Sequence, residues 1–157
     1  MLTNATLGKR FLAFFIDWYL ASLIGSVPII IVQSIFQGDL VVENSLVGLP
    51  LNYAWIGCIL ALFCHFIYYC VIPVSKNANG LTGQTLGWKL TGLQLLTKNQ
   101  RAVSLTVLGL RHMVCFILLQ GYLTSSSIYM IEAVNMSFNI DIIPYFQTMS
   151  YIIVAVS

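Results

Sequence analysis

The first apolar run of this sequence is long enough to cross a membrane, yet it contains an acidic residue. The run extends from about Phe11 to Val32, and crossing a bilayer takes ~20 mostly apolar residues at ~1.5 Å each. Asp17 lies about two turns inside the basic end formed by Lys9 and Arg10. A charge at that depth is costly and is normally retained for a reason. The fold must therefore supply Asp17 with polar partners.

Composition places the whole chain in a membrane. Of its 157 residues, 59% are hydrophobic and only 8% are charged, whereas a soluble domain has about 25% charged residues. We predict an all-α, polytopic membrane helical bundle that forms a single domain over residues 1–157. The last of its four predicted transmembrane segments is short, with fewer than the ~17 residues that are needed to span a bilayer. The segments are 11–32, 51–74, 105–131 and 142–156.

The charges are distributed asymmetrically between the predicted segments. All seven basic residues fall on one side, namely Lys9, Arg10, Lys76, Lys89, Lys98, Arg101 and Arg111. Four of the five acidic residues fall on the other, namely Asp39, Glu43, Glu132 and Asp141. The positive-inside rule then places the N-terminus and the loop 75–104 in the cytoplasm. We expect a multi-pass protein of the cell membrane.

Aromatic and apolar residues near the segment ends indicate contact with the membrane interface. Tyr53 and Trp55 lie near the start of the second segment, and Tyr68 and Tyr69 lie near its end. This placement is typical of interfacial aromatic belts. Within the long loop, we predict a short interfacial helix around Thr85–Leu93, followed by a turn at 98–101.

Several function classes are not supported by the sequence. GxSxG, Walker and HExxH motifs are all absent, so we expect no enzymatic activity. The glycines between residues 80 and 92 lack the strand context of a phosphate-binding loop. The cysteines lie in apolar runs without metal-ligand spacing, so we expect reduced thiols and no metal or other cofactor; they are Cys58, Cys64, Cys70 and Cys115. A net charge of +2 gives no indication of nucleic-acid binding.

Three ionisable residues are predicted to reach a similar depth in the bundle. Asp17 follows Arg10 by seven residues, which is ~10 Å along a helix. His65 precedes Pro73 by eight residues, or ~12 Å from the same side. Arg111 lies near the basic end of the third segment. We therefore expect Asp17, His65 and Arg111 to converge from three helices.

Two interpretations of these ionisable residues are open. In the first, Asp17 binds a cation or a proton and Arg111 supplies the counter-charge, while His65 tunes or passes the proton. In the second, the residues are architectural and nothing is transported. Asp17 then pairs with Arg10 or Arg111, and Arg10 can reach it because residues seven apart share a helix face and the arginine side chain is long.

The loop ahead of the third segment carries the most specific motif of the chain. Residues 80–96 read Gly-Leu-Thr-Gly-Gln-Thr-Leu-Gly-Trp-Lys-Leu-Thr-Gly-Leu-Gln-Leu-Leu. Together with Arg10, Asp17 and the Tyr68-Tyr69 pair, this segment resembles the RDD family of small, mostly bacterial membrane proteins. Its loop pattern is matched by Gly80, Thr82, Gly83, Gln84, Thr85, Gly87, Lys89 and Gly92. The family's arginine at the start of the third span is matched by Arg111.

The resemblance covers nearly the whole chain but departs from the family pattern at one point. The family's second aspartate lies in a cytoplasmic tail after the last span, which this sequence lacks. We therefore expect a truncated or divergent member. The resemblance implies membrane transport, including cation/proton exchange.

Two functional hypotheses follow. In the first, the protein transports cations, protons or a small solute through Arg10, Asp17, His65 and Arg111, and it assembles as a homo-oligomer in the lipid bilayer. In the second, it is a non-transporting accessory subunit that docks a membrane partner through the cytoplasmic loop 75–104.

Overall fold

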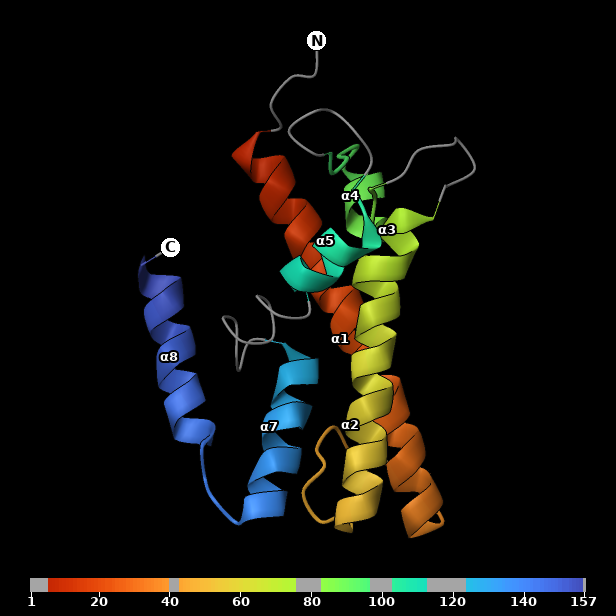
Figure 1. Ribbon diagram of the computed structural model, residues 1–157, viewed down its shortest axis with the longest axis vertical. Coiled ribbons are helices and arrows are strands. Elements are labelled where there is room, and N and C mark those ends of the chain that lie inside the picture. The colour runs from red at the N-terminus through yellow and green to blue at the C-terminus, as the bar shows by residue number, and fades with distance from the viewer. Residues whose placement is uncertain (1–5, 40–42, 76–82, 97–102, 113–123, 157) are drawn as a thin grey trace.

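The computed structural model describes residues 6–39, 43–75, 83–96, 103–112 and 124–156, and these residues contain helices and loops but no β-strand. The predicted all-helical fold is therefore confirmed over the described residues. The helices in chain order are α1 (Leu7–Gln37), α2 (Leu51–Phe66), the π-helix η1 (Ile67–Val71), α3 (Ile72–Val74), α4 (Leu86–Leu90), α5 (Leu105–Gly109), α7 (Ser125–Phe138) and α8 (Ile143–Val156) (Figure 1).

Two long antiparallel helical segments form the centre of the molecule (Figure 1). α1 has 31 residues, or ~46 Å, and continues through Pro28. The second segment runs from Leu51 to Val74 without a break, because α2, η1 and α3 follow one another directly. Both are long and apolar enough to cross a membrane. The first two predicted segments are thus confirmed as helices, and α1 extends beyond the predicted bounds.

Small side chains line the faces on which these two helices meet. In α1 the buried face includes Ala13, Asp17, Ala21 and Gly25; in α2 it includes Ala54, Gly57, Cys58, Ala61 and His65. Small residues at helical spacing allow membrane helices to approach closely. The predicted inward positions of Asp17 and His65 are therefore both observed.

The third predicted segment is not one continuous helix, so the prediction of a single helix over 105–131 was wrong. Thr124 has an extended backbone, with φ −115° and ψ 136°, and α7 begins directly after it. The hydroxyl-rich stretch 124–127 explains the break, because Ser and Thr side chains bond to nearby backbone groups at helix starts. Ser127 Oγ donates to the Thr124 carbonyl at 2.9 Å.

The last loop is shorter than predicted, because α7 continues to Phe138 and includes Glu132. Asn139 then ends the helix in the left-handed conformation, with φ 52°, as is common at helix C-termini. α8 matches the fourth predicted segment to within one residue. Both α7 and α8 have 14 residues, or ~21 Å each, which is less than the ~30 Å hydrocarbon core.

The π-helix η1 changes which residues face inward at the end of the second segment. Tyr68, Tyr69 and Cys70 are all buried, although they are consecutive. A π-helical turn shifts the helix register locally, so neighbouring side chains share the interior. Tyr68 and Tyr69 are 1% and 4% exposed, and the prediction that they form a lipid-facing belt was therefore wrong.

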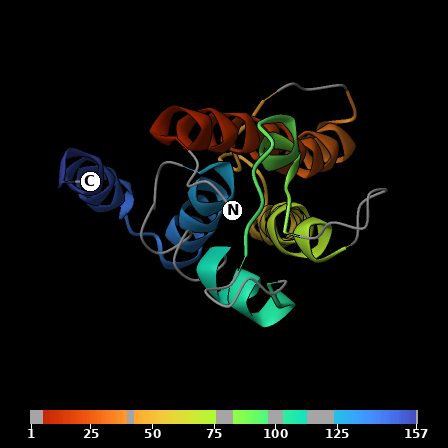
Figure 2. The same ribbon diagram turned by 90° about the horizontal axis from the view of Figure 1, so that it is seen from above.

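The view from above shows α1 and α2 side by side, with α4 against α1 and α7 beside them (Figure 2). In both views α8 lies to one side of this bundle. The apolar core gathers residues of α1, α2, α7 and the loop before α2, including Ile29, Leu46, Ala54 and Ala133.

Enlarging Gly57 should destabilise the contact between α1 and α2. A Cβ atom there would lie 3.2 Å from Ile29 Cδ1 and 3.3 Å from Leu46 Cδ2, so Gly57→Leu should cost about 1–3 kcal/mol through overpacking. Thermal unfolding in detergent measures this loss. Gly8→Leu is the control, since a Cβ at Gly8 meets nothing within 4 Å. Equal melting temperatures for the two variants would contradict the packing.

Candidate functional site

Asp17 is the centre of a buried hydrogen-bond cluster that joins α1, η1 and α4. Its side chain is 2% exposed. Asp17 Oδ1 accepts from the Tyr68 hydroxyl at 2.6 Å and from the Gly87 amide at 2.8 Å. Asp17 Oδ2 accepts from the Thr85 hydroxyl at 2.5 Å. Three donors thus satisfy a carboxylate that would otherwise be strongly destabilised by burial.

The local sequence of α4 explains how two of these donors reach Asp17. Thr85 is the N-cap of α4, with φ −77° and ψ 175°, and its hydroxyl oxygen accepts from the Trp88 amide. The first amides of a helix have no partner within the helix. Gly87 donates one of these amides to Asp17. The N-terminus of α4 therefore faces the carboxylate.

Gly87 lies so close to α1 that no side chain fits. A Cβ atom at this position would overlap the Ala13 carbonyl oxygen and would lie 2.8 Å from Asp17 Cγ. The conformational freedom of glycine is not required here. What is required is the absence of a Cβ atom, because the backbone of α4 touches that of α1.

The other residues of the loop motif shape the turns on either side of α4. Gly83 has a positive φ of 78°, and a Cβ there would overlap the Leu95 carbonyl oxygen. Its amide donates to the Pro73 carbonyl at 2.6 Å. Gln84 Nε2 donates to the Leu93 carbonyl at 2.7 Å, which closes the loop around α4.

Two further motif residues, Lys89 and Gly92, make no hydrogen bond to Asp17. Gly92 has a φ of 70° and follows the end of α4, and Lys89 is exposed. Gly80 and Thr82 lie outside the described residues. The described motif residues thus supply the N-cap of α4, the glycine at which α4 approaches α1, and two glycine turns beside α4. A helix is present within the predicted stretch 85–93, but it is restricted to Leu86–Leu90.

The arginines lie elsewhere than expected. Arg10 and Arg111 are both exposed. Within the described part of the chain, every hydrogen bond to the Asp17 carboxylate comes from Tyr68, Thr85 or Gly87, and no ion pair joins it to an arginine. The donors of Asp17 are therefore two hydroxyls and an amide, instead of the guanidinium groups that the sequence analysis proposed.

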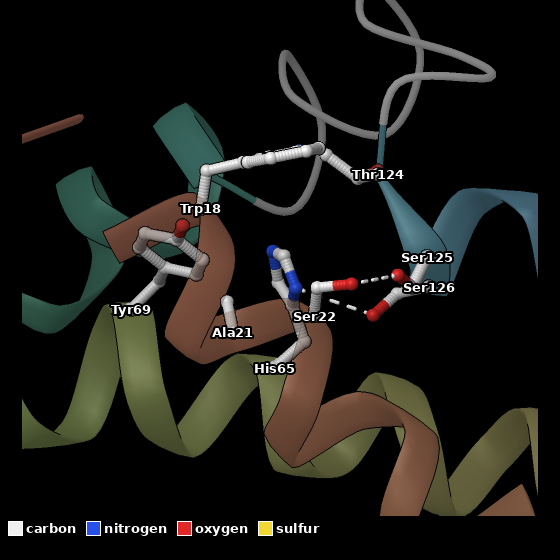
Figure 3. A pocket seen from close by; sticks show the side chains of 8 residues that line it. All are labelled: Trp18, Ala21, Ser22, His65, Tyr69, Thr124, Ser125 and Ser126. Carbon is white, nitrogen blue, oxygen red and sulfur yellow. Dashed lines mark hydrogen bonds between the residues drawn. The ribbon is translucent and has the colours of Figure 1, made fainter. Parts of the chain in front are cut away.

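His65 lies deeper in the bundle, between α1 and α7. Figure 3 shows its ring with Ser22 of α1 and Ser126 of α7 on one side and Tyr69 on the other. His65 Nδ1 lies 3.2 Å from Ser126 Oγ, and Ser22 Oγ lies 2.5 Å from Ser125 Oγ. These groups line a cavity of about 10 Å³, which is roughly the space that one water molecule needs.

A second cavity lies next to Asp17. It measures about 30 Å³ and is lined by Asp17, Tyr69, Thr85 and His112, among others. Tyr69 lines both cavities. Its ring stacks on His112 with centroids 4.9 Å apart and contacts the His65 ring, tilted by 44°, with centroids 4.6 Å apart. Asp17, His112, Tyr69 and His65 thus form a polar series in which neighbouring side chains line the same cavity.

The sequence did not reveal two features of this site. Tyr68 lies on the inward helix face together with His65, but its hydrogen bond to Asp17 joins residues that are 51 positions apart. His112 follows Arg111 directly, and a histidine at the start of an apolar run was the only available signal. Within the described residues, no three His, Cys, Asp or Glu side chains come together in a way that could hold a metal ion.

Comparison with known proteins identifies the family. A family model described as "RDD family" matches residues 4–156. The chain belongs to the RDD family. No curated protein and no solved structure matches the chain. Membership of the RDD family and two apolar helices of spanning length together support a membrane protein.

Adding one methyl group at Gly87 should detach α4 from Asp17. Gly87→Ala places a Cβ against Ala13 and Asp17, so the amide–carboxylate hydrogen bond is lost at a cost of about 1.5–3 kcal/mol. We expect a lower melting temperature and faster proteolysis within 83–95. Gly109→Ala is the matched control, because Gly109 also lies in a five-residue helix and its Cβ would meet nothing within 4 Å. Unchanged proteolysis of Gly87→Ala would contradict the docking.

Proposed function

We propose that this RDD protein moves protons or small cations across the membrane, with Asp17 as the group that couples proton binding to movement of α4. The observation that carries the proposal is a carboxylate only 2% exposed, which lines a cavity together with His112 and Tyr69. Ionisable side chains inside membrane proteins commonly mark ion or proton paths.

The contacts of Asp17 provide a mechanism for the coupling. All three of its partners donate, so they match an ionised carboxylate, which only accepts. A proton on either oxygen converts an acceptor into a donor and breaks one of these contacts. Because Thr85 and Gly87 both belong to the α4 region, proton uptake by Asp17 would weaken the attachment of α4 to α1.

The polar series beyond Asp17 supplies groups that can pass a proton. Histidine is the side chain best suited to exchange protons near neutral pH, and His112 and His65 flank the Tyr69 ring. The two cavities, of about 30 and 10 Å³, have room for about two water molecules and about one. In the proposed mechanism, transport therefore requires α4 to move.

The remaining features of the proposal concern topology and assembly. We place the α4 end in the cytoplasm and the protein in the cell membrane, because the exposed Lys9, Arg10, Lys89 and Arg111 favour the cytoplasmic side. We propose a protein without enzymatic activity. In the described part of the chain, two helical segments of spanning length and the shorter α7 and α8 are few helices to surround a transport path. We therefore propose a homo-oligomer.

Replacing Asp17 tests the transport proposal directly. Proteoliposomes with the Asp17→Asn variant should lose pH-driven proton or cation flux almost completely, because asparagine cannot carry the proton. Tyr68→Phe keeps the carboxylate and removes only one donor, so it should retain part of the flux. The amount of folded protein in the vesicles is matched by size-exclusion chromatography. Wild-type flux in the Asp17→Asn vesicles would sink the proposal.

An accessory role is the second candidate, and the surface of α4 favours it. Leu86 and Leu90 are 44% and 74% exposed, and residues four apart lie on one helix face. This apolar face beside the basic Lys89 could bind a partner subunit. A stoichiometric partner recovered in mild detergent, together with vesicles that show no flux, would favour this role over transport.

A further inference from the structure

The end of the bundle opposite α4 is closed by residues 44–49, which fold inward before α2 begins (Figure 1). Leu46 and Leu49 are 0% and 5% exposed and belong to the apolar core with Ile29 and Ala54. Gly48 has a φ of 91°, a left-handed conformation that turns the chain between the two leucines. Residues 44–49 therefore act as a plug between α1, α2 and α7.

Hydrogen bonds from α7 hold this plug in place. Glu132 Oε2 accepts from the Leu46 amide at 2.8 Å, and Glu132 Oε1 accepts from the Ser45 hydroxyl at 3.1 Å. One turn earlier on α7, the Tyr129 hydroxyl donates to Asn44 Oδ1. α1 adds a further contact, since Gln33 Nε2 donates to the Ser45 carbonyl at 2.5 Å.

The arrangement at Glu132 parallels the one at Asp17. In each case a carboxylate on a helix accepts hydrogen bonds from one backbone amide and one hydroxyl of a segment that folds against that helix. Charge-assisted bonds of this kind are about twice as strong as neutral ones. A carboxylate thus contributes strongly to holding a segment in place at each end of the molecule.

α7 connects Glu132 to the polar series that begins at Asp17. Ser126, which contacts His65, precedes Tyr129 by one turn, and Glu132 follows after nearly another. Six residues separate Ser126 from Glu132, or ~9 Å along the helix. Ser126 beside His65 and Glu132 at the plug therefore belong to one helix, with Tyr129 of the apolar core between them.

We propose that residues 44–49 form a gate at the end of the transport path opposite Asp17. Glu132 is its latch, that is, the side chain whose hydrogen bonds hold the gate closed. This inference rests on the proposed transport function. Both carboxylates hold their segments in this structure, and in this state the proposed path is closed at both ends. Release of the segment held by Glu132 would open the core beneath it, including Ala54.

Labelling of a cysteine at position 54 tests the gate. Ala54 is 0% exposed, so Ala54→Cys reports opening when Cys58, Cys64, Cys70 and Cys115 are replaced by alanine. A membrane-impermeant maleimide is added to the protein in nanodiscs. In this background Glu132→Gln should raise the labelling rate roughly tenfold or more, because it loses charge-assisted bonds to Ser45 and Leu46. Glu43→Gln, an exposed carboxylate beside the same loop, is the control and should leave the rate unchanged.

The outcomes separate this inference from the transport proposal. Equal labelling of Glu132→Gln and its parent overturns the gate, even if flux depends on Asp17. Faster labelling supports the gate; if wild-type vesicles then carry no flux, transport fails while the latch stands. Should Glu132→Gln aggregate, Ser45→Ala decides, since it removes one donor and keeps the carboxylate. A several-fold rise in its labelling supports the latch, and an unchanged rate overturns it.

Discussion

The hydrogen bond from the Gly87 amide to the Asp17 carboxylate is the contact on which the α4 end of the bundle depends. Burying a carboxylate is tolerated only when donors replace water, and here a backbone amide, a threonine and a tyrosine do so. Because these donors come from α4, its cap and η1, one side chain joins three separate segments. Loss of the carboxylate would leave the Gly87 amide and two hydroxyls without their acceptor.

The long helices could be predicted from the sequence because hydropathy and small-residue spacing are local signals. Ala21 and Gly25 in α1 and Ala54 and Ala61 in α2 mark the buried faces correctly. The break at Thr124 was missed because the apolar residues on both sides of it dominate the mean hydropathy of the segment. The hydroxyl run 124–127 was the available signal, since such residues favour helix starts over helix interiors.

The candidate site was only partly predictable. The inward position of Asp17 and the loop motif were identified, but the direct contact between them was not. Thr85 and Gly87 follow Asp17 by 68 and 70 positions, and a single sequence does not show that residues so far apart are in contact. By charge alone, Arg10 and Arg111 were the expected partners of the Asp17 carboxylate, yet both arginines are exposed. Exposure leaves a guanidinium hydrated, whereas a buried pair must lose that hydration. The hydrogen bond from Tyr68 to Asp17 was not predicted either, because it joins residues 51 positions apart.

Amide hydrogen exchange over residues 83–95 tests the central claim most directly. The protein is compared with its Asp17→Asn variant in nanodiscs, and residues 44–49 at the other end serve as the internal reference. The account predicts slow exchange in 83–95 of the wild-type protein and exchange at least tenfold faster in the variant, because α4 loses its anchor. Exchange in 83–95 that is equally slow in both proteins would contradict it.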